Sequence, residues 1–179
     1  MDGGITRRAF THSLLQRGVM RAALAALFLS VAIAALVPSA TARAQTAAHA
    51  ARSAASLAAR ETRLRLTAWR YAVHQRGKPY IYGDSGPSGY DCSGLVYAAY
   101  RRAGITLPRT TYGMLGSWRL VRVPKSRARR GDLAFFGTGH VELYDWGKWT
   151  FGAQHTGTRL GFHAMSIYWE PTMYFRVQL

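Results

Sequence analysis

The sequence of 179 residues contains a single cysteine, Cys92, which excludes an internal disulfide and any zinc site built from several cysteines. Acidic residues are also scarce, because eight Asp and Glu stand against 24 Lys and Arg, and the formal net charge is +16. This excess predicts an anionic partner and carries no information about the fold. Hydrophobic residues make up 49% of the chain, which is enough to bury the core of one domain of ordinary size.

The sequence also lacks an apolar run long enough to span a membrane. The longest run, residues 23–37, would form a helix of about 22 Å, whereas the hydrocarbon core of a bilayer is roughly 30 Å thick. Arginines precede the run, Pro38 follows it, and small residues occupy positions 40, 42 and 44, which is the order of a secretory signal peptide. We expect cleavage after Ala44 and no membrane anchor afterwards.

Two alternatives remain for this signal. Translation starting at Met20 would still give a complete signal peptide, and the segment 6–10 with its paired arginines could form a twin-arginine signal. Five basic residues and one acidic residue lie in 1–44, so the exported chain keeps 19 basic and 7 acidic residues, or +12. We therefore expect acidic cell-envelope polymers, and not nucleic acid, as its anionic partners.

The pattern after the signal predicts an α+β domain over residues 61–179, preceded by an Ala-rich linker over 45–60. Apolar residues at helical spacing predict a helix over 61–76, and a loop dense in Gly, Pro and Ser follows over 78–90. Asp91 can cap a second helix over 93–103. The remainder alternates in the manner of strands separated by turns, at 132–136, 141–144, 149–153, 159–163 and 173–177.

Cys92 lies at the expected start of the second helix, where unpaired backbone N–H groups and the helix dipole favour an anion such as a thiolate. A nucleophilic cysteine needs a base. His140 follows a Gly-Thr-Gly turn at the start of a predicted strand, where its imidazole can lie at the rim of the sheet. His74 and His49 are expected to face solvent.

Four collinear blocks resemble the NlpC-type cysteine peptidases of bacterial cell walls. They are KPY…GYDCSGLV (78–96), LPRT (107–110), RGDLAFF (130–136) and GHVELY (139–144). The resemblance covers nearly the whole mature chain and implies a papain-like domain, with the nucleophile at a helix N-terminus and helices packed on an antiparallel sheet. It implies no metal and no organic cofactor, and we expect a monomer.

The resemblance also implies roles for individual residues. Cys92 would be the nucleophile and His140 the general base. Tyr80 would point its hydroxyl into the site, and Asp91 and Ser93 would shape the pocket for the substrate amine. The implied reaction is hydrolysis of an amide bond in peptidoglycan stem peptides, between D-glutamate and a diamino acid, through a thioester.

The sequence departs from the family pattern at the third catalytic position. The family has a polar residue about twelve positions after the histidine, whereas this chain has Gly152, which cannot orient an imidazole. We expect His155 to supply the missing group, with Gln154 and His163 as alternatives.

Three further hypotheses stay open. The chain could be a catalytically inactive, basic wall-binding protein, which the glycine at the third position favours. It could also be a thiol amidase or acyltransferase on the same fold. A stretch rich in arginine over 119–130 could hold the protein on acidic wall polymers, although such stretches are usually only solvated surface.

Overall fold

The computed structural model describes residues 39–179, so the expected signal peptide lies almost wholly outside the described residues. The chain divides into two units, Met1–Ser53 and Ala54–Leu179. Of the first unit, residues 39–53 are described, and they are helical from Ala40 onward. Among residues 39–179 no helix combines the length and the apolar character that a membrane span requires.

Helix α2 (Ala40–His74) is longer than the sequence pattern predicts. The helix expected over 61–76 is present, but the Ala-rich segment before it is also helical, with its side chains exposed as far as residue 60. Alanine has the highest helix propensity of all residues, so this segment needs no apolar face to adopt helical geometry. Within the second unit, Ala68 and Ala72 of α2 are fully buried.

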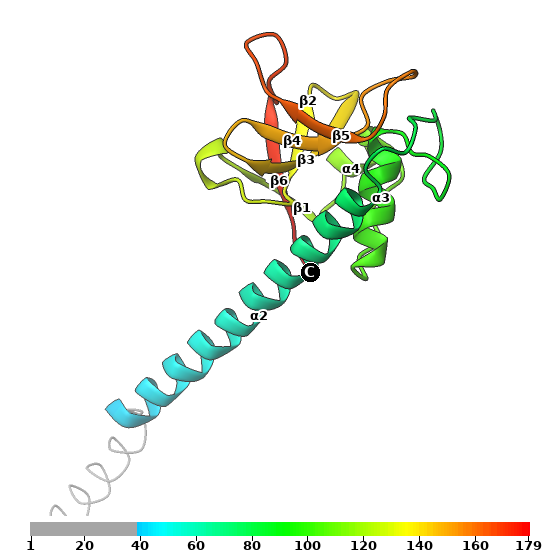
Figure 1. Cartoon of the computed structure of the whole chain (residues 1–179). Helices are drawn as coiled ribbons and strands as arrows, with labels where there is room; N and C mark the ends of the chain where they lie inside the picture. The colour runs from blue at the N-terminus through cyan, green and yellow to red at the C-terminus, as the bar shows by residue number, and fades with distance from the viewer. Residues whose placement is uncertain (1–38) are drawn as a thin grey trace, which may run out of the picture. The chain divides into compact units, whose positions relative to one another are not determined.

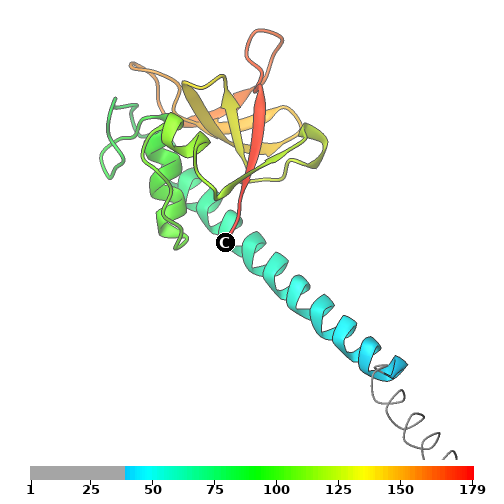
Figure 2. The same ribbon diagram turned by 180° about the vertical axis from the view of Figure 1, so that it is seen from behind.

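The second unit contains a six-stranded antiparallel sheet together with the helices α3 (Cys92–Arg102) and α4 (Thr111–Leu115) (Figures 1 and 2). The strand order is β1-β6-β2-β3-β4-β5. The strands are β1 (Leu120–Val123), β2 (Leu133–Phe136), β3 (His140–Trp146), β4 (Trp149–Gly152), β5 (Gly161–Ala164) and β6 (Met173–Val177). The α+β class with an antiparallel sheet is confirmed.

The core lies between the helices and one face of the sheet. Strand residues alternate between the two faces, so Val141 and Leu143 of β3 are buried against Val96 and Ala99 of α3. A smaller cluster that includes Ala134 covers the opposite face. The residues between them on β3, His140 and Glu142, therefore project from the face of the strand that does not carry the main core.

A buried ion cluster joins α2 to the sheet. Asp132 is fully buried and accepts from Arg176 of β6 at 2.7 Å, and Arg65 of α2 lies 3.7 Å away. Gly131 allows this approach, because a Cβ at that position would lie 2.8 Å from Cγ of Arg65. Removing one partner would leave a buried charge uncompensated, so the cluster fixes α2 against the sheet.

A strand and a short α-helix were missing from the sequence-based expectation, as was the 3-10 helix η1 (Lys125–Arg127). Strand β1 pairs with β6 at one edge of the sheet, and α4 is a single turn capped by Thr110, whose hydroxyl accepts from the N–H of Gly113 at 3.1 Å. Both lie in the stretch 108–126, where basic residues obscure the apolar pattern. The segment of α4 also borders the cleft at Cys92.

Candidate active site

The start of helix α3 positions the cysteine. Asp91 is the N-cap residue, and its Oδ1 accepts from the N–H of Gly94 at 2.6 Å, so Cys92 occupies the first helical position. Gly94 is required here, since a Cβ would lie 2.1 Å from the carbonyl oxygen of Asp84. Cys92 is buried, with 9% of its surface exposed. The expected placement at a helix N-terminus is confirmed.

A dense set of donors surrounds the Asp91 carboxylate. Arg109 binds it with both ends of its guanidinium, Nη1 to Oδ1 at 2.9 Å and Nη2 to Oδ2 at 2.8 Å. The N–H of Gly83 donates to Oδ2 at 2.9 Å, and Ser93 donates to Oδ1 at 3.3 Å. The hydrogen bonds that Arg109 donates to Asp91 raise the pKa of Arg109 further, so its guanidinium stays charged. Arg109 belongs to the LPRT block, but the sequence did not indicate that it pairs with Asp91.

A cleft of about 370 Å³ opens beside the cysteine. Tyr80 and Tyr82 line it from the loop before α3, and Tyr112 lines it from α4. Burial and the neighbouring Cys92 raise the pKa of Tyr80, so its hydroxyl stays protonated at neutral pH. Asp91, Ser93 and Arg109 form the other wall, so all three residues predicted to contact substrate lie at this cleft.

The imidazole of His140 lies at the start of β3, opposite Phe136 of β2. Its ring packs against Trp169, with centroids 5.3 Å apart, and Nε2 lies 3.2 Å from Oε1 of Glu142. Burial lowers the pKa of His140, but hydrogen bonding and charge from Cys92 and Glu142 outweigh it and raise the pKa to about 9. The structure thus brings Cys92 and His140 together, as the sequence predicts.

Glu142 holds the opposite side of this histidine. Its carboxylate is fully buried and contacts three groups: His140, His163 Nδ1 at 2.9 Å from the same Oε1, and the Thr150 hydroxyl, which donates to Oε2 at 2.5 Å. Burial raises the pKa of Glu142, but the hydrogen bonds from His140, His163 and Thr150 prevail and lower it to about 2. A buried anion is tolerable only with such compensation.

The structure shows no hydrogen bond between His155, which was expected to orient His140, and the His140 ring among residues 39–179. The His155 ring is exposed, and its Nδ1 lies 2.8 Å from the carbonyl oxygen of Thr156. Among residues 39–179, no hydrogen bond joins the Gln154 side chain to His140, which binds Glu142 instead. His163 reaches Glu142 rather than His140. The group that binds the free side of His140 is Glu142, two residues along the same strand.

Gly152 leaves the space that Glu142 occupies. A Cβ at Gly152 would lie 2.5 Å from Cγ and 2.8 Å from Cδ of Glu142. Position 152 was expected to carry a polar side chain but has none. The space that such a side chain would need is occupied by the carboxylate of Glu142 on the neighbouring strand β3. Strand alternation was the available signal, because His140 and Glu142 share one face of β3.

Comparisons with known proteins agree with this fold. A solved structure of the peptidoglycan hydrolase RipB from Mycobacterium tuberculosis superposes with a TM-score of 0.60 at 26% identity and covers 68% of each chain. Structures of RipA, the resuscitation promoting factor interacting protein, include one mutated at a cysteine and one at a glutamate, each with a TM-score of 0.59, 25% identity and coverage of 66% and about 65%.

Two curated relatives are named as endopeptidases. The bifunctional muramidase/DL-endopeptidase CwlT of Bacillus subtilis is 35% identical over 112 residues, and the murein DD-endopeptidase MepH of Escherichia coli is 36% identical over 107 residues. The matches cover 58% and 55% of this chain, but only 33% and 40% of the relatives. The NlpC/P60 family model matches residues 77–177, which include Cys92, His140 and Glu142, and the chain therefore belongs to the NlpC/P60 family.

Proposed function

We propose that the protein is a cysteine peptidase that hydrolyses an amide bond in peptidoglycan stem peptides. One observation carries the proposal: a cysteine at a helix N-terminus adjoins a histidine that is held by a buried carboxylate. The endopeptidase names of the relatives support peptidoglycan as the substrate. The protein would act outside the cytoplasm after loss of the segment 1–44.

The proposed reaction begins with the Cys92 thiolate and the His140 imidazolium. The sulfur attacks the amide carbonyl carbon, and backbone N–H groups at the start of α3 stabilise the oxyanion. Because Nε2 of His140 faces Glu142, Nδ1 is the nitrogen left for the cysteine and the leaving group. The proton of His140 passes to the leaving amine as the C–N bond breaks, and a thioester remains on Cys92.

Water then resolves the thioester. His140 takes a proton from the water, the hydroxyl oxygen attacks the thioester carbon, and the C–S bond breaks to release a carboxylic acid and regenerate the thiolate. Glu142 acts as a positioning residue, since it holds the His140 ring in one tautomer and stabilises the imidazolium. Arg109 and the N-cap Asp91 keep the start of α3 in place throughout.

The bond cleaved is proposed to join D-glutamate to a diamino acid. The relatives' names include both a DL- and a DD-endopeptidase, so they do not decide the linkage. A mass-spectrometric inventory of muropeptides released by the full chain tests this directly. Release of the whole stem peptide, cut at its bond to the sugar, would favour an amidase instead, and a product joined to an added amine would favour an acyltransferase.

The alternative of an inactive wall-binding protein rested on Gly152. The contacts of Glu142 weaken that argument, because a carboxylate lies beside His140 without any side chain at Gly152. Alkylation of Cys92 separates the two hypotheses. An active site requires rapid reaction with iodoacetamide below pH 7, whereas an inert buried thiol would react slowly at that pH.

A further inference from the structure

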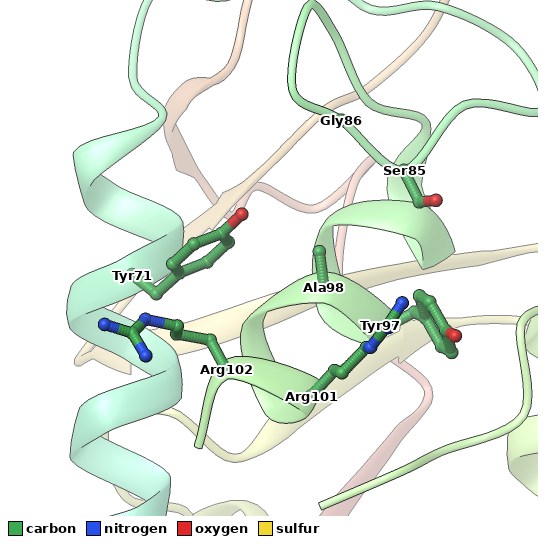
Figure 3. Close-up of a pocket in the computed structure, with 7 residues that line it drawn as sticks. All are labelled: Tyr71, Ser85, Gly86, Tyr97, Ala98, Arg101 and Arg102. Carbon is green, nitrogen blue, oxygen red and sulfur yellow. The ribbon is translucent and has the colours of Figure 1, made fainter. Parts of the chain in front are cut away.

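A second cavity lies between α2 and α3. Its volume is about 410 Å³, and Tyr71, Tyr97, Arg101, Arg102, Ser85 and Gly86 line it (Figure 3). An adjoining cavity of about 470 Å³ shares Tyr71 and Arg102 and adds Arg70 and His74 of α2. We call the two together the α2–α3 groove. It shares no lining residue with the cleft at Cys92.

The groove presents hydrogen-bond donors and positive charge without a compensating acid. Among the residues that the structure describes, no Asp or Glu lines either cavity. Among residues 39–179, no carboxylate forms an ion pair with Arg70, Arg101 or Arg102, and all three side chains are exposed. Arg102 extends from α3 toward α2 and Tyr71, while Arg101 lies beside Tyr97 (Figure 3). Arg101 and Arg102 thus line the first cavity on different sides, and Arg70 and Arg102 line the adjoining one.

The arginine-rich stretch 119–130 differs from the groove in this respect. Lys125 pairs with Glu170, and Arg130 donates to Asp145 at 2.5 Å while its guanidinium stacks on Trp69. Arg119 in turn lies over the ring of Trp118 at 4.4 Å. Two of the six cations in this stretch are thus paired with carboxylates, whereas among the described residues none of the three arginines of the groove is. This difference favours the α2–α3 groove as the binding site for an acidic polymer.

We propose that the α2–α3 groove binds a phosphodiester group of an anionic cell-wall polymer. A guanidinium group presents parallel N–H donors that match the oxygens of a phosphate. Several guanidinium groups together offer more donors than a single carboxylate can accept, so a chain of phosphodiesters suits them better. The ring of Tyr97 and the hydroxyl of Ser85 complete a polar, aromatic surface for the sugar or polyol between phosphates. None of the exposed large apolar side chains lines the groove, which favours a soluble polymer over a bilayer surface.

The biological purpose rests on the proposed function, since a polymer attached to the wall would keep the enzyme near its substrate. The binding itself can be measured independently, on the full chain carrying Cys92→Ala. Isothermal titration with soluble poly(glycerol phosphate) tests the groove, and poly-L-glutamate of equal charge tests carboxylate binding. Vesicles containing phosphatidylglycerol test a lipid source of phosphate.

Arg101→Gln combined with Arg102→Gln should weaken binding of poly(glycerol phosphate) about tenfold or more, because both substitutions remove hydrogen-bond donors that carry a charge. Arg101→Lys with Arg102→Lys should lose part of that affinity, since lysine keeps the charge and lacks the paired donors. The matched control, Arg122→Gln with Lys148→Gln, removes equal charge from exposed sites outside the groove and should change affinity less than about threefold.

Equal losses in the groove and control variants would overturn the proposal, as would tighter binding of poly-L-glutamate or binding to vesicles alone. Hydrolysis of a small soluble muropeptide by the groove variant with Cys92 intact keeps the two proposals apart. Lost polymer binding with unchanged hydrolysis is the expected result. Absence of hydrolysis in the otherwise unmodified chain, with polymer binding intact, would refute only the proposed enzymatic function.

Discussion

The side chain of Glu142 fills the space that any side chain at Gly152 would need, since a Cβ on Gly152 would lie 2.5 Å from Cγ of Glu142. The two positions are thus mutually exclusive sites for one carboxylate beside His140. In this protein the carboxylate belongs to β3, and Gly152 of β4 leaves room for it because glycine has no side chain.

This exclusion predicts that the carboxylate can be moved. Glu142→Ala should reduce kcat by about 10²-fold or more, because His140 loses the group that fixes its tautomer. Adding Gly152→Glu to Glu142→Ala should restore a substantial part of the activity, as the alanine leaves only a Cβ 3.0 Å from the new side chain. Steady-state kinetics on a soluble muropeptide measures both.

The control for that pair is Gly152→Glu alone, which should be poorly active because two side chains then compete for one space. If the double variant folded normally by circular dichroism yet remained as inactive as Glu142→Ala, the positional exchange would be refuted.

The pH profile of kcat/KM should fall on its alkaline side near pH 9. His140 has a pKa raised to about 9, so its proton is lost only above that value, and with it the imidazolium that donates to the leaving amine. Glu142→Gln removes a charge that raises this pKa, and the alkaline limb should then move toward pH 6.5. An alkaline limb unchanged by Glu142→Gln would exclude Glu142 as the partner of the imidazolium.

His163 and His155 should behave differently. His163→Ala removes one of the three donors to Glu142 and should lower kcat roughly tenfold, because a hydrogen bond to a charged group contributes roughly 1.5–3 kcal/mol and only part of it acts through His140. His155→Ala should leave kcat and KM near the wild-type values, as its ring binds only a nearby carbonyl. A strong loss in His155→Ala with an intact His163→Ala would reverse this assignment.

Arg109 should matter for stability as well as activity. Arg109→Ala leaves the buried Asp91 carboxylate without its two guanidinium donors, and we expect the free energy of unfolding to fall by about 2 kcal/mol. Chemical denaturation monitored by tryptophan fluorescence measures this. Tyr112→Ala, an exposed neighbour at the same cleft, is the control and should unfold at the wild-type midpoint.

The placement of Cys92 and His140 could be predicted from the sequence because the signals for it are local. Asp91 caps the helix that begins at Cys92, and the glycine turn before His140 starts a strand, so both placements follow from short motifs. Glu142 was missed because its role depends on cross-strand packing: only the arrangement of β3 beside β4 shows that Gly152 leaves room for it. A charged residue on the same strand face as the histidine, combined with the glycine, was the usable signal.

The full length of α2 and the presence of β1 could not be predicted from the hydrophobic pattern of the sequence. Alanine-rich sequence without an apolar face resembles a linker, yet its intrinsic propensity suffices for helical geometry. Val121 and Arg122 are exposed, so strand β1 leaves little hydrophobic pattern and is defined by its pairing with β6.

The most direct test of the central claim compares the muropeptides released from purified peptidoglycan by the unmodified chain and by Cys92→Ala. We predict that the unmodified chain releases stem peptides cut between D-glutamate and the diamino acid, and that Cys92→Ala, with an unchanged circular dichroism spectrum, releases none. Release of the same products by Cys92→Ala at the unmodified rate would contradict the account.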